Sequence, residues 1–330
     1  MSADGVIIRP LDADRDLPDL VRAYNAEAAA DGVEEVWTVD SVAAWFGHPT
    51  EQFDAARDVV VAERDGGVVG AAGMDWVDTR DGAYREYRHW GLVLPELRGR
   101  GIGSALLARQ VDHARELAAA SAAEIGERAP ILGSFAAAGR PGEALLRDQG
   151  YEAARWFFDM LRPTLDAVEV PAMPQGLELR PVTPDQYETI WRANREAFRD
   201  HWGGSDESLD AMRRLLDEPH HDPSLWLVAW DGDEVVGGVW NEVNPEENES
   251  LGIARGWLAS VFTRRAWRRR GLAAALIGQS LELLRDRGLT SAALGVDADN
   301  PSGALGLYEA AGFEIHERFT AWRRPLEDTR

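Results

Sequence analysis

The stretch TRRAWRRRGLAAA, residues 263–275, decides how this 330-residue chain is interpreted. Five of the seven residues from Arg264 to Arg270 are arginine, and helix-favouring residues follow at once. Gly271 and Ala273 remove side-chain bulk where that helix begins, so free backbone N–H groups and the positive end of the helix dipole face the loop. Such a loop suits an anion such as a pyrophosphate, although most arginine runs are simply a solvated basic face.

These arginines stand out because the chain is acidic. All 35 basic residues are arginine, 57 residues are acidic, and the net charge of −22 divides into −11 on each side of Leu165. An evenly acidic protein repels nucleic acid and anionic membranes, so we predict neither as a partner.

Missing residue types exclude several chemistries. The absence of cysteine excludes disulfides, thiolate metal sites and cysteine nucleophiles, and we predict no metal. The absence of lysine excludes a Walker-type phosphate loop and a lysine Schiff base. No apolar stretch is long enough to span a bilayer, and the charged first 20 residues do not resemble a signal peptide, so we expect a cytoplasmic protein.

The chain repeats itself. Four signals recur in the same order, at residues 7–10 and 177–181, 59–70 and 226–237, 98–103 and 268–273, and 150–151 and 312–313. The second of these pairs reads as a β-hairpin with an Asp-Gly turn. The similar offsets, 171, 167, 170 and 162 residues, indicate two copies of one unit of roughly 160 residues.

We therefore predict two tandem domains, 1–163 and 177–330, joined by a proline-rich linker at 164–176. Each copy reads as strand, helix, short helix, hairpin, strand, arginine/glycine loop, long helix, strand, short helix, strand. The long helix of the second copy is predicted from Ala273 to Arg287, because apolar residues recur there on one face. This order predicts an α/β (α+β) fold in which a central mixed sheet is flanked by helices.

A second informative stretch is LGVDADNPSGALGLYEAAGF, residues 294–313. A strand ends near Val296, Asn300-Pro301 opens a helix, and Tyr308 lies on that helix shortly before a Gly312 cap. Taken alone, Tyr308 reads more readily as a core aromatic, and Asn300 as a helix N-cap.

Together, the R-x-x-G-x-G/A loop between a strand and a long helix, the asparagine after the next strand and the ending L-Y-E-x-x-G-F resemble the GNAT superfamily of acyl-CoA-dependent N-acetyltransferases. The resemblance covers nearly the whole chain twice. Two-copy architecture is similar to that of mycothiol synthase and of uncharacterised actinobacterial acetyltransferases. The motifs are specific to the superfamily and do not identify the acceptor. We expect a small-molecule amine acceptor, and a monomer or homodimer.

The resemblance implies roles for residues of the second copy. Phe262 and Thr263 would end a strand that pairs with the pantetheine arm of acetyl-CoA, the implied co-substrate, with Thr263 standing where valine is usual. Asn300 would approach the thiol end, and Tyr308 would be the general acid. The pyrophosphate would be wrapped by Arg268, Arg269, Arg270, Gly271, Leu272 and Ala273.

The first copy matches only in part. The implied second cofactor site consists of Val93, Arg98, Gly99, Arg100, Gly101, Ile102 and Gly103. Leu146 stands where the second copy has Tyr308, and the segment 139–142 (GRPG) replaces the Asn-Pro segment. The first copy is therefore expected to lack the matching acid, and the second to be the catalytic one.

Without cysteine, direct attack by an amine on the acetyl thioester is the simplest chemistry, with the oxyanion held by a strand amide. The base is left open among Glu196, Asp200, His201 and Glu242, each of which also reads as an ordinary surface residue. Two other interpretations stay open: a non-catalytic acyl-CoA binding or sensing module, and nucleic-acid binding through Arg264–Arg270.

Overall fold

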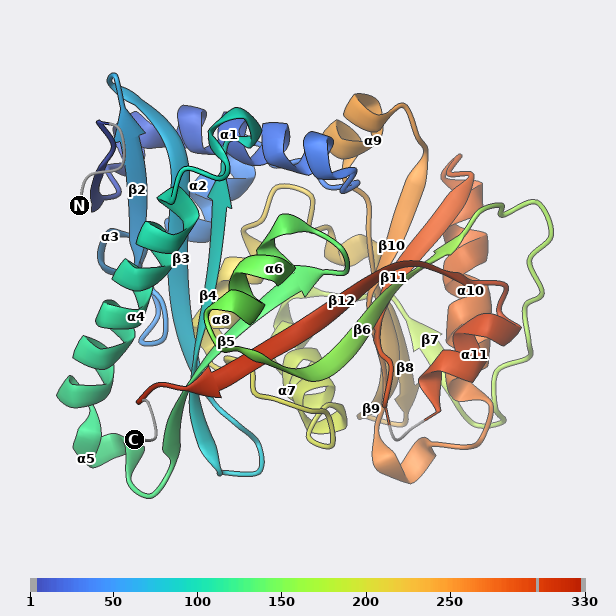
Figure 1. The fold of residues 1–330 in the computed structure, drawn as a ribbon. Helices are drawn as coiled ribbons and strands as arrows, with labels where there is room; N and C mark the ends of the chain where they lie inside the picture. Colours follow the sequence, from blue (N-terminus) through green and yellow to red (C-terminus); the bar gives the residue numbers. More distant parts are fainter. Residues whose placement is uncertain (1–4, 301–302, 328–330) are drawn as a thin grey trace. The chain divides into compact units, whose positions relative to one another are not determined.

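The structure is a computed structural model, and it describes residues 5–300 and 303–327. These residues form two compact units. Unit 1 contains residues 1–154, 203–206 and 320–330, and unit 2 contains residues 155–202 and 207–319. The predicted α/β (α+β) class is confirmed, because each unit has a mixed sheet packed against helices (Figure 1).

The first copy supplies thirteen elements in the predicted order, with three extra short helices, one of them a 3₁₀ helix. They are β1 (Ile7–Pro10), α1 (Ala13–Asp31), α2 (Val39–Phe46), α3 (Ala55–Asp58), β2 (Val59–Arg64), β3 (Gly67–Asp78), β4 (Tyr84–Val93), the 3₁₀ helix η1 (Pro95–Leu97), α4 (Ile102–Ala120), α5 (Ala122–Ile125), β5 (Ala129–Ala137), α6 (Pro141–Asp148) and β6 (Glu152–Arg162).

The second copy follows the same plan. Its elements are β7 (Glu178–Arg180), η2 (Pro184–Gln186), α7 (Tyr187–Ala197), α8 (Leu209–Leu216), η3 (Pro223–Leu225), β8 (Leu227–Asp231), β9 (Glu234–Glu242), α9 (Pro245–Leu251), β10 (Arg255–Thr263), η4 (Arg265–Trp267), α10 (Leu272–Asp286), β11 (Ser291–Asp297), α11 (Ala304–Ala310) and β12 (Glu314–Pro325). Helix α11 begins later than the Asn300-Pro301 signal predicts, and Pro301 lies outside the described residues.

In unit 1 the strand order is β1-β2-β3-β4-β5, followed by the part of β12 from Thr320 onward. The pairs β1–β2, β2–β3 and β3–β4 are antiparallel, and β4 and β5 are parallel. In unit 2 the order is β6-β11-β10-β9-β8-β7, and β10 and β11 form the parallel pair. The compact units therefore do not coincide with the two sequence copies, because the final strand segment of each copy belongs to the other unit.

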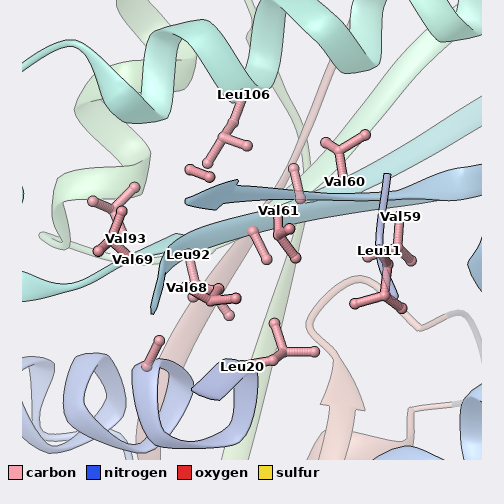
Figure 2. Packing of buried hydrophobic residues seen from close by; sticks show 14 of the residues in the cluster. Leu11, Leu20, Val59, Val60, Val61, Val68, Val69, Leu92, Val93 and Leu106 are labelled. Atoms are coloured by element: carbon pink, nitrogen blue, oxygen red, sulfur yellow. The ribbon is translucent and has the colours of Figure 1, made fainter. Parts of the chain in front are cut away.

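The core of unit 1 lies on both faces of its sheet. Figure 2 shows Leu106 of helix α4 packing on one face and Leu20 of helix α1 on the other, with the valines of β2 and β3 between them. Leu20 and Val61 are fully buried. Strands covered on both faces read as nearly continuous apolar runs, which explains the sequence VVVA at residues 59–62.

No helix among the described residues is long and apolar enough to cross a membrane. The glycines of the Asp65-Gly66 and Asp231-Gly232 turns both have positive φ, as tight hairpin turns require. The long helix expected from Ala273 to Arg287 is confirmed as α10, shifted by one residue at each end.

Candidate active site

In each unit the parallel strand pair separates along its length. In unit 1, β4 and β5 are paired from Tyr84 opposite Ala129 to Arg88 opposite Gly133, and β4 then continues to Val93 without β5 as a partner. In unit 2, β10 pairs with β11 only from Arg255 to Trp257. Backbone N–H and C=O groups beyond these points face an open edge, where an extended, amide-containing ligand can pair with them.

The arginine/glycine loop lies at the open end of each separated pair. Gly101 and Gly271, the N-caps of α4 and α10, have φ of 82° and 84°, a conformation that favours glycine. Neither cap supplies a side-chain hydrogen bond to the helix, so first-turn N–H groups stay available for an anion. Ile102 and Leu272 point into the cores, so each contributes its backbone rather than its side chain.

The first arginine of each loop is an anchor. Arg98 binds Asp31 (Nη1 to Oδ1, 2.7 Å) and Glu27 (Nη2 to Oε1, 3.0 Å), both on helix α1. Burial raises the pKa of Glu27, against the opposing effect of Arg98. Arg268 similarly donates to Asp200 at 3.0 Å and to the Ala197 carbonyl at 2.8 Å, at the end of α7. These bonds fix the loops to the helices, so a ligand meets the residues that follow.

The other arginines of the loop Arg264–Arg270 in unit 2 are also partly neutralised. Arg264 pairs with Glu196 (Nη2 to Oε2, 2.9 Å) and Glu234 (Nη1 to Oε1, 2.5 Å), and Arg265 pairs with Asp200 at 2.5 Å. Hydrogen bonds from Arg268, and secondarily Arg265, hold the pKa of Asp200 below its usual value.

Arg269 and Arg270 remain at the tip of the loop, exposed and, within the described part of the chain, without a carboxylate partner. Arg269 has a φ of 61°, where its counterpart Gly99 has 73°. Arg269 thus carries a cation in a backbone conformation that costs a non-glycine residue about 1–2 kcal/mol. In unit 1, Arg100 occupies the position of Arg270.

Unit 1 contains a cavity of about 510 Å³ along this path. Its lining runs from Gly99, Gly101 and Gly103 at the loop to His89 and Ser134 where β4 and β5 separate. The segment at 139–142, which departs from the family pattern, contributes Pro141 and Gly142 to the same wall.

In unit 2, Phe262 and Thr263 end strand β10 opposite Gly238 and Gly237. The Phe262 side chain is buried and meets the edge of Trp240 at a centroid distance of 6.2 Å. The Thr263 hydroxyl oxygen is buried and has no hydrogen-bond partner among the described residues. Because a buried polar group without a partner is costly, this hydroxyl fits a polar group of a ligand arm.

Tyr308 lies on α11, is 7% exposed and meets Phe313 edge-on at 6.2 Å. Burial raises its pKa to about 12, so the phenol is protonated at neutral pH. Its counterpart Leu146 lines the cavity of unit 1. Asn300 lies before α11, where its backbone N–H donates to the Asp297 carbonyl at 3.1 Å.

A β-bulge distinguishes unit 2. The register between β10 and β9 shifts between Leu258 and Ser260, leaving Ala259 as the extra residue. The register between β4 and β3 is continuous from Val93 to Arg85. Bulges leave a residue out of the ladder and redirect its groups, and they are common beside active sites.

The four candidate bases differ in their contacts. Glu196 and Asp200 pair with arginines, and His201 packs against Phe198 at 4.3 Å. Glu242 pairs instead with the buried His221, with 2.7 Å between Oε1 and Nδ1. Among the four, Glu242 is thus held by a histidine rather than by a permanent cation.

Sequence reasoning missed a polar pair in unit 1. His89 Nε2 lies 2.7 Å from the hydroxyl of Tyr151, and both side chains are buried. Tyr151 aligns with Phe313, so the hydroxyl at a position that is apolar in the other copy was the available signal.

Comparisons with known proteins agree with this geometry. Residues 187–313 match the Acetyltransferase (GNAT) family, and residues 55–152 match an Acetyltransferase (GNAT) domain. A mycothiol acetyltransferase of Geodermatophilus obscurus is 32% identical over 91% of this chain and 91% of its own length. This chain belongs to the GNAT acetyltransferase family.

Other relatives extend this result to the whole tandem GNAT chain. A mycothiol acetyltransferase of Thermobispora bispora is 31% identical over 87% of the chain and 89% of its own length. A GCN5-related N-acetyltransferase from Sphaerobacter thermophilus superposes with a TM-score of 0.70 at 25% identity, covering 98% of this chain and 96% of that one. A tandem GNAT protein from the clavulanic acid biosynthesis pathway shares the fold, with a TM-score of 0.72 at 18% identity, covering 98% and 100% of the two chains. The chain is therefore a tandem GNAT N-acetyltransferase, as its motifs predict.

Proposed function

We propose that unit 2 transfers the acetyl group of acetyl-CoA directly to an amine of a small molecule, with Tyr308 as general acid. The observation that carries this proposal is a buried, protonated phenol in unit 2, at the position whose counterpart, Leu146, lines the cavity of unit 1. Acetyl-CoA would supply the acyl group as an activated thioester, and the chain would supply binding, orientation and a proton.

The loop and strand would divide the binding of the cofactor between them. Arg269, Arg270 and the first-turn amides of α10 suit the pyrophosphate, because fixed N–H donors and exposed cations converge there. The open edge of β10 and the Thr263 hydroxyl suit the amide-containing arm. Phe262 then acts through its backbone, since its side chain is packed in the core.

Two groups would act at the reacting end. The bulge at Ala259 offers a strand amide outside the ladder to the developing oxyanion. The Tyr308 hydroxyl would donate its proton to the departing sulfur, because a phenol is an effective acid when it is aligned. Asn300 would lie beside the same end of the cofactor.

The acceptor is proposed to be a small-molecule amine, in keeping with the mycothiol acetyltransferases among the relatives. Glu242 is the candidate base, because hydrogen bonds from Arg268 and Arg265 lower the pKa of Asp200, and Arg264 engages the Glu196 carboxylate.

A second function is favoured for unit 1. Its cavity and loop suit coenzyme A through Val93, Arg100 and the amides of residues 99–103, but Leu146 replaces the tyrosine and β4 has no bulge. We propose that unit 1 binds the cofactor without transferring its acyl group.

The test is the release of free thiol from acetyl-CoA across a panel of amines. Tyr308→Phe should lower kcat at least ~10-fold, because general-acid help is worth roughly 10²- to 10⁴-fold. Affinity for acetyl-CoA should be unchanged, and Leu146→Phe in unit 1 is the matched control. An unchanged kcat in Tyr308→Phe refutes the assignment, and absence of thiol release with every amine favours a binding module.

A further inference from the structure

We propose that unit 1 recognises the acyl group of an acyl-CoA through His89, which donates a hydrogen bond to the thioester carbonyl while Tyr151 holds its imidazole. This inference rests on the proposed binding of the cofactor in unit 1. It adds that unit 1 distinguishes a thioester from free coenzyme A.

His89 lies where a thioester would end in this cavity. It follows Arg88, the last β4 residue opposite β5, and therefore stands at the point where the two strands separate. Ser134, the next residue of β5, donates from its hydroxyl to the His89 carbonyl at 2.9 Å. Both residues line the cavity at the end away from the loop glycines.

In the proposed arrangement the imidazole proton lies on Nδ1. The Tyr151 hydroxyl lies 2.7 Å from His89 Nε2, and its O–H is the donor in this pair. The neutral ring then carries its proton on Nδ1, which has no hydrogen-bond partner among the described residues.

The charge of the pair suits a neutral carbonyl. Burial, and secondarily the charge of Arg324, lowers the pKa of His89 to about 3, and burial raises that of Tyr151 to about 12. His89 is therefore neutral at pH 7 and cannot act as an imidazolium acid. Its N–H remains a donor, and a carbonyl oxygen is an acceptor that free coenzyme A lacks.

Two other polar side chains of this cavity are already engaged. The Gln110 amide donates to the Ala72 carbonyl at 2.9 Å, and the Ser134 hydroxyl donates to His89 itself. Leu146 offers no donor, and β4 lacks the bulge that frees an amide in unit 2. His89 therefore offers this end of the cavity a ring N–H that the Gln110 and Ser134 side chains do not.

The proposal is tested by calorimetric binding of acetyl-CoA, coenzyme A and S-ethyl-CoA, in which a methylene replaces the carbonyl. The full chain is used with Arg269→Glu and Arg270→Glu, two exposed changes that weaken the loop of unit 2. One neutral hydrogen bond predicts an approximately 3- to 10-fold preference for acetyl-CoA over S-ethyl-CoA. His89→Leu should abolish this preference, and the control Leu145→Met, on the same cavity wall, should keep it.

A second readout does not depend on affinity. The ¹⁵N signal of His89 Nδ1 should shift on addition of acetyl-CoA and stay unmoved with S-ethyl-CoA, and Tyr151→Phe should reduce the difference while leaving the fold intact. Equal binding of acetyl-CoA and S-ethyl-CoA, or a preference that survives His89→Leu, overturns the role of His89. Failure of all three ligands to bind unit 1 instead refutes the cofactor site on which the inference rests.

Discussion

Lowering the pH from 8 to 5 should destabilise the protein through His89. In the folded protein burial lowers the His89 pKa to about 3, from an ordinary value of 6.5. The unfolded chain therefore binds a proton below pH 6.5 that the folded chain does not, and stability falls as the pH falls. With these two pKa values, proton linkage lowers the free energy of unfolding by about 2 kcal/mol at pH 5 relative to pH 8. Between the two pKa values the slope approaches ~1.4 kcal/mol per pH unit.

The assay compares urea unfolding of the full chain at pH 8 and pH 5 in the wild type and in His89→Leu. The substitution itself changes stability, so the quantity of interest is the difference between the two pH dependences. We expect His89→Leu to lose about 2 kcal/mol less than the wild type on acidification. His316→Leu, which removes an exposed histidine, controls for removal of a histidine in general.

Imidazole NMR of the wild type provides the direct check. The His89 ring should remain neutral at pH 5, because its site is buried and Nε2 accepts a hydrogen bond from the Tyr151 hydroxyl. A His89 titration midpoint above pH 5, or identical pH dependences in the wild type and His89→Leu, would refute the reasoning.

Two further changes test unit 2. Arg269→Gly should alter the free energy of unfolding by less than ~1 kcal/mol, because relief of the positive φ is offset by the greater freedom of the unfolded chain. Its affinity for acetyl-CoA should fall roughly 5- to 10-fold, because a phosphate contact is lost. Unchanged affinity in calorimetry would contradict that contact. Deletion of Ala259 should restore the plain register seen between β4 and β3 and lower kcat about 10²- to 10³-fold with an unchanged circular dichroism spectrum. Near-normal turnover by the deletion variant would show that the bulge has no part in the chemistry.

Element order was predictable because its signals are local. Asp-Gly turns, apolar periodicity and glycine at the start of a long helix depend on neighbouring residues, and these elements appear where the sequence indicates. Assignment of the strands to units was not predictable. The residue pattern of β12 predicts a strand but does not indicate which strand it pairs with. In the structure its residues from Thr320 onward belong to unit 1.

The chemistry of the arginine loop was predictable only in part. Clustering of Arg264–Arg270 indicates positive charge, but the carboxylates that neutralise Arg264, Arg265 and Arg268 lie 30 to 68 residues away in the chain. Folding brings Glu196 and Asp200 to the loop, so of its five arginines only Arg269 and Arg270 lack a carboxylate partner among the described residues. The anion site stays a prediction, now centred on the loop tip and the helix amides.

Comparison of the two sequence copies cannot reveal how their strands differ in register. Between the hairpin and the loop, the offset of the copies grows from 167 to 170 residues. This change combines loop differences with the extra residue Ala259, and a sequence offset cannot separate a bulge from a longer turn. The bulge matters because it alters which backbone groups face the open edge without changing any side chain. Similar motifs would then frame different chemistry, with an amide outside the ladder and Tyr308 in unit 2, and His89 with Tyr151 in unit 1.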